Sequence, residues 1–185
     1  MEARRLFRLD NEVLAFRFTA TVSDRAGAAP RERLTDPGRL ALWLDAAGLG
    51  VPGVPGVSPA ELRDALALRE AVYRAGLAVA AARHPDPADA AVLNAATAAG
   101  RPRPALRDGL AVWRLDPENP VADALAVLAA DAVHRLGGPD RSRVKACEGP
   151  GCAGLFLDTS RGTNRRWCSM NTCGNRVKKA RLADR

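Results

Sequence analysis

The residues in this sequence best suited to chemistry are four cysteines, all of them in the C-terminal quarter of the chain. They form two equal pairs, Cys147 with Cys152 and Cys168 with Cys173, in the pattern C-x4-C-x15-C-x4-C. Each pair lies in a short loop that can turn two thiolates toward one point, and a tetrahedral zinc ion needs four such donors at about 2.3 Å. The pattern therefore predicts one structural Zn²⁺, with no coordination position left open for catalysis.

The alternatives for these cysteines are buried free thiols or two disulfides. Free cysteines have no reason to occur as two equal pairs with none elsewhere in the chain. The N-terminal "MEARRLFRLDNEV" has no apolar run of the kind that a secretory signal needs. We therefore expect a cytoplasmic protein, and in a reducing compartment paired cysteines are more often metal ligands than disulfides. No segment approaches the roughly 20 apolar residues of a membrane span, so no membrane partner is expected.

The segments around the cysteines predict a small folded unit over residues 139–185. The stretches "GLFLD" and "NRRWC" flank the polar "TSRGT", and we expect them to form two short strands that return the chain to the second pair. A helix that begins near Cys173 would place Cys173, Val177 and Ala180 on one face, toward the metal. The unit is thus expected to be a treble-clef-like or ribbon-like zinc module.

The charge of the chain is concentrated in the same region. Residues 139–185 contain 11 basic and 4 acidic residues, whereas residues 1–138 contain 17 of each, so the whole net charge of +7 lies beside the cysteines. A basic surface held on a rigid module favours a nucleic-acid partner, and DNA is the partner we expect. The expected nucleic-acid contacts are Arg161, Arg165, Lys178, Lys179, Arg181 and Arg185.

Other side chains beside the ligands are expected to support the zinc site. Arg176 follows the Gly-Asn turn next to Cys173, and Arg166 stands just before Trp167 and Cys168. Donors placed this close to a thiolate cluster commonly bond to the sulfurs or to the neighbouring main chain. The residues assigned to this role are Arg166, Trp167, Asn175 and Arg176.

Residues 1–138 predict a mainly helical domain with short β elements. An acceptor side chain followed by proline marks a helix start, because the acceptor caps the first turn and proline has no N–H to leave unsatisfied. Ser58 and Glu61 also form a capping-box pattern. The four starts predicted in this way are Asp36-Pro37, Ser58-Pro59, Asp86-Pro87 and Asn119-Pro120.

Two β elements and a linker complete this domain. "LAFRFTATV", from Leu14 to Val22, is expected to be a strand, and "RPALR" and "LAVWRL" flank an Asp108-Gly109 dipeptide suited to a hairpin turn. "GVPGVPG", residues 50–56, is typical of a linker loop. Arg69 lies between apolar positions of a predicted helix, where we expect it to snorkel to the surface; a place in a ligand cavity is the alternative.

The C-terminal segment resembles the CGNR zinc finger of bacterial proteins. It has the four cysteines, the stretches "FLDTSR" and "RRWCSM", and the tetrapeptide Cys173-Gly174-Asn175-Arg176. The preceding part resembles the ABATE domain, a domain of stress-induced transcription regulators, in "LTDPGRLALWLDAAGL" and "LREAVYRAGLAVA". The resemblance implies zinc binding and control of transcription. In the family the N-terminal strand reads L-D-F-x-N-T, whereas this chain has Arg17 and Ala20 at the Asp and Asn positions, which would alter any ligand pocket built from those two residues.

Together these features predict a DNA-binding transcriptional regulator. Its N-terminal domain would sense a small molecule or mediate self-association, and its zinc module would contact the nucleic acid. A zinc-stapled adaptor that binds an acidic protein surface is the alternative, and an RNA-binding protein is a third possibility. The sequence contains no phosphate-binding glycine loop, nucleophile elbow or paired carboxylates, so an enzyme is not expected.

Overall fold

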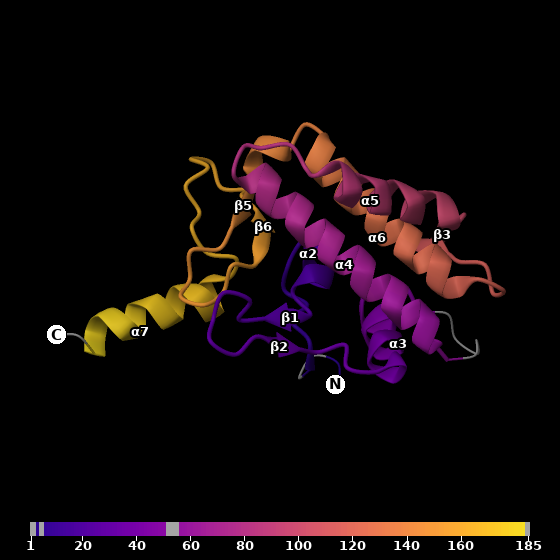
Figure 1. The fold of residues 1–185 in the computed structure, drawn as a ribbon, viewed down its shortest axis with the longest axis horizontal. Coiled ribbons are helices and arrows are strands. Elements are labelled where there is room, and N and C mark those ends of the chain that lie inside the picture. Colours follow the sequence, from indigo (N-terminus) through magenta and orange to yellow (C-terminus); the bar gives the residue numbers. More distant parts are fainter. Residues whose placement is uncertain (1–2, 4–5, 51–55, 184–185) are drawn as a thin grey trace.

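The computed structural model describes residues 3, 6–50 and 56–183, except for the side chains of residues 180, 181 and 183. The described part is mainly helical, with three separate two-stranded antiparallel sheets, and this confirms the predicted fold class (Figure 1). None of its helices combines the length and the apolarity needed to cross a bilayer. The elements are α2 (Leu14–Thr19), β1 (Val22–Ser23), β2 (Arg31–Glu32), α3 (Pro37–Ala46), α4 (Pro59–Ala80), α5 (Pro87–Ala99), β3 (Arg103–Arg107), β4 (Leu110–Arg114), α6 (Pro120–Gly137), β5 (Val144–Ala146), β6 (Leu155–Leu157) and α7 (Asn175–Ala183).

All four predicted helix starts are confirmed in position. The side chains of Asp36 and Asp86 accept hydrogen bonds from main-chain N–H groups of the first turn. Ser58 and Glu61 form both bonds of the capping box at the start of α4. Asn119 makes no side-chain cap, although α6 still begins at the following proline. Proline at the first helical position therefore fixes this start without the help of an acceptor side chain.

Helix α4 is the central element of the molecule. It packs against α2, α5 and α6 and also against β5, so it joins the helical domain to the cysteine-bearing segment (Figure 1). The core beside it is closed by fully buried aromatic side chains, in which Phe18 and Trp43 lie with ring centroids 5.0 Å apart. One continuous apolar core thus extends from α3 to β6.

The strand predicted for Leu14–Val22 is wrong over most of its length, because its first six residues form helix α2. Four of those six residues are buried, so the side chains do not alternate between core and solvent as a half-buried strand would require. The helix start is held by groups outside the stretch. Asn11 Oδ1 accepts from the N–H of Val13 at 3.1 Å, and Asp131 of α6 accepts from the N–H of Ala15 at 2.8 Å.

Arg69 does not snorkel to the surface; its buried guanidinium is the centre of an ion network with partly exposed carboxylates. Its side chain is only 4% exposed and makes two bonds to the carboxylate of Glu32, at 2.7 and 2.6 Å. It also donates to Thr21 Oγ1 at 3.1 Å and to Glu70 at 2.9 Å. Because a buried charge must be paired, these bonds fix the β1–β2 region against α4.

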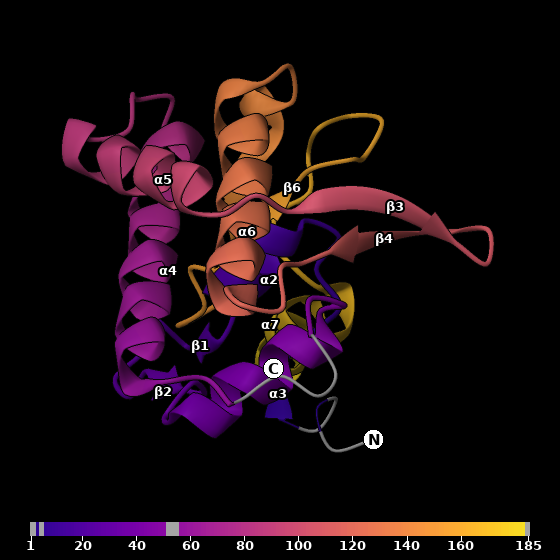
Figure 2. The same cartoon turned by 90° about the vertical axis from the view of Figure 1, so that its right-hand side faces the viewer.

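The hairpin predicted around Asp108-Gly109 is confirmed as β3 and β4. Arg107 pairs with Leu110, and the two turn residues have φ angles of 51° and 76°. This is the left-handed geometry that a two-residue hairpin turn requires. Figure 2 shows the hairpin projecting from the helices. Most of the predicted linker loop, residues 51–55, lies outside the described residues.

The cysteine-bearing segment packs directly onto α4. Leu155 of β6 lies against Gly76, where a Cβ atom would come within 2.2 Å of Leu155 Cδ1. Tyr73 donates to the carbonyl of Ala153 at 3.1 Å, and Asn11 Nδ2 donates to the carbonyl of Leu155 at 2.9 Å. The absence of a side chain at Gly76 therefore allows this close approach.

We expect Gly76→Ala to destabilise the protein. Alanine favours an exposed helix over glycine by about 1 kcal/mol, but overpacking a close-packed core costs about 1–3 kcal/mol, so the free energy of unfolding should fall. Denaturant unfolding followed by circular dichroism measures the change. Gly137→Ala is the matched control, because a Cβ there meets no atom within 4 Å and stability should hold or rise. An equal gain in the free energy of unfolding for both variants would contradict the close packing of Leu155 on Gly76.

Candidate metal centre

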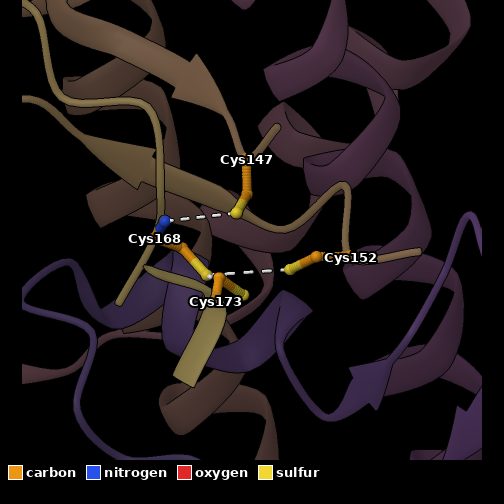
Figure 3. Close-up of side chains that lie close together, drawn as sticks. All are labelled: Cys147, Cys152, Cys168 and Cys173. Atoms are coloured by element: carbon orange, nitrogen blue, oxygen red, sulfur yellow. Dashed lines mark hydrogen bonds between the residues drawn. The ribbon is translucent and has the colours of Figure 1, made fainter. Parts of the chain in front are cut away.

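The four cysteine sulfur atoms converge on one point. They lie within 4.8 Å of one another, and the Sγ atom of Cys168 is 3.7 Å from those of both Cys152 and Cys173. All four residues are buried, and Figure 3 shows their side chains turned toward a common centre. Zinc–sulfur bonds of 2.3 Å in a tetrahedron place sulfur atoms about 3.8 Å apart. The donor set and its spacing therefore fit one tetrahedral Zn²⁺.

The first pair lies in the turn of a hairpin made by β5 and β6. Cys147 follows β5 directly, and its N–H continues the ladder by donating to the carbonyl of Gly154 at 2.8 Å. The prediction of two short strands in "GLFLD" and "NRRWC" is therefore wrong in its second half. "LFL" does form β6, but its partner is Val144–Ala146, which precedes the first cysteine, and "NRRWC" forms no strand. The two antiparallel segments lie on either side of the short "CEGPGC" loop, so pairing them needs less loop closure.

Glycine shapes this first loop at two points. A Cβ at Gly149 would lie 2.9 Å from Cys173 Cβ, so a side chain there would push the two halves of the site apart. Gly151 has a φ of 72°, a conformation that favours glycine. The N–H of Gly149 also points to the Sγ of Cys147, at 3.4 Å, as does the N–H of Cys168 at 3.3 Å. Such bonds stabilise a thiolate and orient it toward the ion.

The last ligand, Cys173, is presented by a π-helical turn at the root of the last helix. Cys173 lies in the turn Met170–Gly174, whose N–H groups at Cys173 and Gly174 both donate to the carbonyl of Ser169. Helix α7 begins two residues after Cys173, which confirms the predicted helix start. Val177 is half-buried on this helix, whereas the side chain of Ala180 lies outside the described residues.

A buried carboxylate that sequence reasoning missed closes the long loop between the two pairs. Asp158 is fully buried and accepts from Lys145 Nζ at 2.6 Å and from the N–H groups of Ser160 and Arg165 at 3.0 and 2.9 Å. Burial opposes its ionisation, yet these donors hold the pKa of Asp158 well below its usual range. The signal in the sequence is an acidic residue directly after the apolar run "LFL".

Three of the four residues predicted to support the zinc site form bonds that link its parts, and the fourth packs on it. Arg166 pairs with Glu148 at 2.6 Å, and its carbonyl accepts from the N–H of Glu148. Arg176 donates to Asp24 at 3.0 Å and to the carbonyl of Pro150 at 3.2 Å. Asn175 donates to the carbonyl of Asn171 within the turn before α7, and Trp167 packs against the cysteine cluster.

The predicted nucleic-acid contacts fall into two groups. Lys178, Lys179 and Arg161 are exposed and make no ion pair within the described part of the chain. Arg165 is instead bound to the main chain, with Nε donating to the carbonyl of Trp167 at 2.9 Å and Nη2 to that of Cys168 at 2.6 Å. Its guanidinium also lies 5.1 Å from the ring centroid of Phe156. The side chain of Arg181 and all of Arg185 lie outside the described residues.

Arg8 is a second contact that the sequence did not reveal. Its Nη2 atom lies 3.7 Å from Cys168 Sγ and 3.6 Å from a carboxylate oxygen of Asp10. Arg8 and Cys168 are 160 positions apart, so no spacing rule could pair them. The N-terminal segment thus places a positive charge beside one of the thiolates.

The electrostatics of the cluster favour a divalent ion. Hydrogen bonding among the sulfurs lowers the pKa of Cys152 and raises the pKa of Cys147 and Cys168, and burial raises the pKa of Cys173. Four buried thiolates so close together repel one another unless a cation lies between them. A bound Zn²⁺ supplies that charge and holds the four ligands as thiolates, as a structural site requires.

A helical domain packed onto a four-cysteine zinc module defines the class of this protein. Comparison with protein families matches residues 12–139 to the ABATE domain, described as "Putative stress-induced transcription regulator", and residues 143–185 to the CGNR zinc finger. The chain belongs to the ABATE family and carries a C-terminal CGNR finger, which confirms the resemblance and the single structural zinc. A search of curated proteins finds no match.

We expect Cys173→Ser to abolish zinc binding and to unfold the C-terminal module. Free energy of zinc binding at such a site, about 10–16 kcal/mol in isolated fingers, is also folding free energy. Metal analysis should give close to one zinc per wild-type chain and none for the variant. Thr172→Ser, one residue away, serves as the control and should keep its zinc. A fold unchanged by removal of both the ligand and the metal would refute a structural zinc.

Zinc binding should release about three to four protons per chain at pH 7. The pKa values of Cys147, Cys168 and Cys173 lie above that of an ordinary thiol, so these groups are protonated at neutral pH before the metal binds. Affinity should therefore fall as the pH falls. Calorimetric titration in two buffers of different ionisation enthalpy counts the protons, and an enthalpy that is the same in both would contradict the expectation.

Proposed function

We propose that this protein is a cytoplasmic, non-catalytic DNA-binding transcriptional regulator. The observation that supports this role best is the exposed pair Lys178 and Lys179 on α7, for which the described contacts include no carboxylate partner. Unpaired cations on a rigid support attract the phosphate backbone and release its counterions. Arg161, on the exposed loop between the cysteine pairs, adds a third cation to the module.

Helix α7 is placed to make such a contact. It extends away from the rest of the molecule, and its root is fixed by Cys173 and by the bonds of Arg176 (Figure 1). The helix has nine residues, fewer than the 12–15 that an isolated helix needs for marginal stability in water. The zinc-bound turn before it supplies the stability that its own length does not.

The chemistry favours contact with phosphates over reading of bases. Lysine ammonium groups act as point charges, whereas base recognition uses side chains such as arginine with a fixed, two-pronged geometry. Arg165 and Arg176 could have offered that geometry, but the guanidinium of Arg165 is bound to the main chain of the module and that of Arg176 to Asp24 of the helical domain. We therefore propose phosphate neutralisation as the main contribution of the described residues.

The helical domain is proposed to sense a small molecule or to mediate self-association. A groove of about 710 Å³ lies between the N-terminal segment, α2, α3 and the turn before α7, and Arg17 lines it. The guanidinium of Arg17 donates twice to the carbonyl of Asn11, at 3.1 and 2.9 Å. Arg17 is therefore bound to the main chain at the position where the family resemblance implies Asp, and the residue has a structural function in this chain.

A zinc-stapled adaptor for an acidic protein is the second candidate. Leu182 on α7 is 69% exposed and Met170, in the turn before it, is 46% exposed, and apolar side chains beside cations suit a protein surface. RNA binding has less support. The module offers Trp167 as its one tryptophan, and its half-buried ring packs against the cysteine cluster rather than standing free for base stacking.

The double variant Lys178→Ala/Lys179→Ala tests the proposal that α7 binds DNA. Fluorescence anisotropy with duplex DNA, measured over a range of salt concentrations, should show binding that weakens steeply with salt in the wild type. Loss of two phosphate contacts should reduce the slope of log K against log salt by about two and weaken binding to all sequences alike. Zinc content should stay at one per chain.

Arg83→Ala serves as the matched control, because Arg83 is an exposed cation just beyond the C-terminal end of α4. Equal binding by the wild type and the double variant would refute the proposal for α7. Binding to single-stranded RNA with higher affinity than to duplex DNA would favour the RNA-binding alternative. Absence of binding to either nucleic acid would favour the adaptor.

A further inference from the structure

The β3–β4 hairpin presents an apolar face that the described part of the chain does not cover. Pro104 lies opposite Trp113, and Leu106 lies opposite Ala111, so these four side chains share one face. All four residues are exposed, with Leu106 at 78% and Trp113 at 42%. A large exposed apolar surface marks an interaction site more often than a solvated loop.

The opposite face of the hairpin is cationic and has no counter-charge. Arg103 lies directly opposite Arg114, and Arg107 is on the same face four residues further along β3, opposite Leu110. The described ion pairs include none of these three residues. Like charges opposite each other destabilise a ribbon, and a two-stranded hairpin is only marginally stable alone. This hairpin therefore fits a partner that offers both apolar surface and carboxylates.

A groove on the helical domain has these two properties. It has a volume of about 480 Å³ and lies between α4, α5 and the N-terminal end of α6. Its floor includes Leu68, Val121 and Leu125, and Glu61 and Asp64 contribute acidic groups to its lining. The groove lining contains no basic side chain. Its charge is thus opposite to that of the hairpin.

The hairpin cannot reach the groove of its own molecule. In Figure 2, α4 and the hairpin lie on opposite sides of α6, and the hairpin points away from α4 and α5. A hairpin in this groove must come from another molecule. The chain contains both complementary surfaces, so a second copy can supply each of them.

We propose that two copies of this chain form a dimer in which each inserts its β3–β4 hairpin into the α4–α5–α6 groove of the other. Trp113 and Leu106 cover the apolar floor, and Arg103 and Arg107, on the outer face of the hairpin, extend their long side chains around its edge toward the carboxylates of the rim. The exchange is reciprocal, so a two-fold axis relates the copies and both contacts are buried at once. Direct packing of the apolar face of one hairpin on that of another would instead leave Arg103, Arg107 and Arg114 on the outer faces, away from the contact and from the acidic groove.

Charge exchange between two variants tests this contact. Variant A is Arg103→Glu/Arg107→Glu, which reverses the charge of the hairpin. Variant B is Asp64→Lys/Asn119→Lys, which reverses the charge of the groove. It leaves Glu61 in place to cap α4. Sedimentation analysis of the full-length wild type should give a dimer, whereas each variant alone should dissociate at least tenfold more readily. A one-to-one mixture of A and B should restore a dimer of mixed composition, because each reversed surface then meets its complement; native mass spectrometry identifies it.

Removal of the apolar anchors provides a second test. Leu106→Ala/Trp113→Ala should dissociate like variant A, and mixing it with variant B should not restore the dimer. Arg83→Glu, just beyond the far end of α4, is the matched control and should stay dimeric. Circular dichroism and zinc content confirm that each variant is folded. A wild type that is monomeric at about 50 µM, a folded variant B that remains a dimer, or a mixture of A and B that remains monomeric would each overturn the proposal.

Discussion

The convergence of four thiolates on one divalent ion is the constraint on which the C-terminal module depends. The module has a small core of its own, built from the cysteines, Phe156 and part of Trp167. Its elements are short, with strands of three residues and a helix of nine. So small a core does not hold such elements together through burial alone, and the ion supplies the stability that is missing.

The main chain around the ion is organised to serve it. Asp158 draws the long loop together through Lys145 and Arg165, and the returning chain places Cys168 beside Cys147. Gly149 allows the first loop to approach Cys173. These residues do not bind the ion, but they determine where the ligands stand. The same frame orients α7 and therefore the two lysines on which the proposed function rests.

The sequence predicted those features that depend on local chemistry. The ligands were evident from the pairing of Cys147 and Cys152 with Cys168 and Cys173, and the helix starts from acceptor-proline pairs such as Asp36-Pro37. It could not predict features that depend on distant groups. Helix α2 is capped by Asp131, and Arg8 contacts Cys168 across 160 positions. Only the folded chain brings those partners together, which is why α2 was predicted as a strand and Arg8 was missed.

The close packing of Leu155 on Gly76 has a practical consequence for experiments on the isolated zinc finger. Leu155 fills the space left by the missing side chain of Gly76, and all three residues of β6 are buried. Tyr73 of α4 donates a hydrogen bond to the carbonyl of Ala153. A fragment that begins after α6 would keep every zinc ligand yet lose helix α4, against which β6 packs. It would expose apolar strand residues to solvent and would aggregate more readily than the intact chain. Affinities measured on such a fragment would therefore describe a different surface from the one that the whole protein presents.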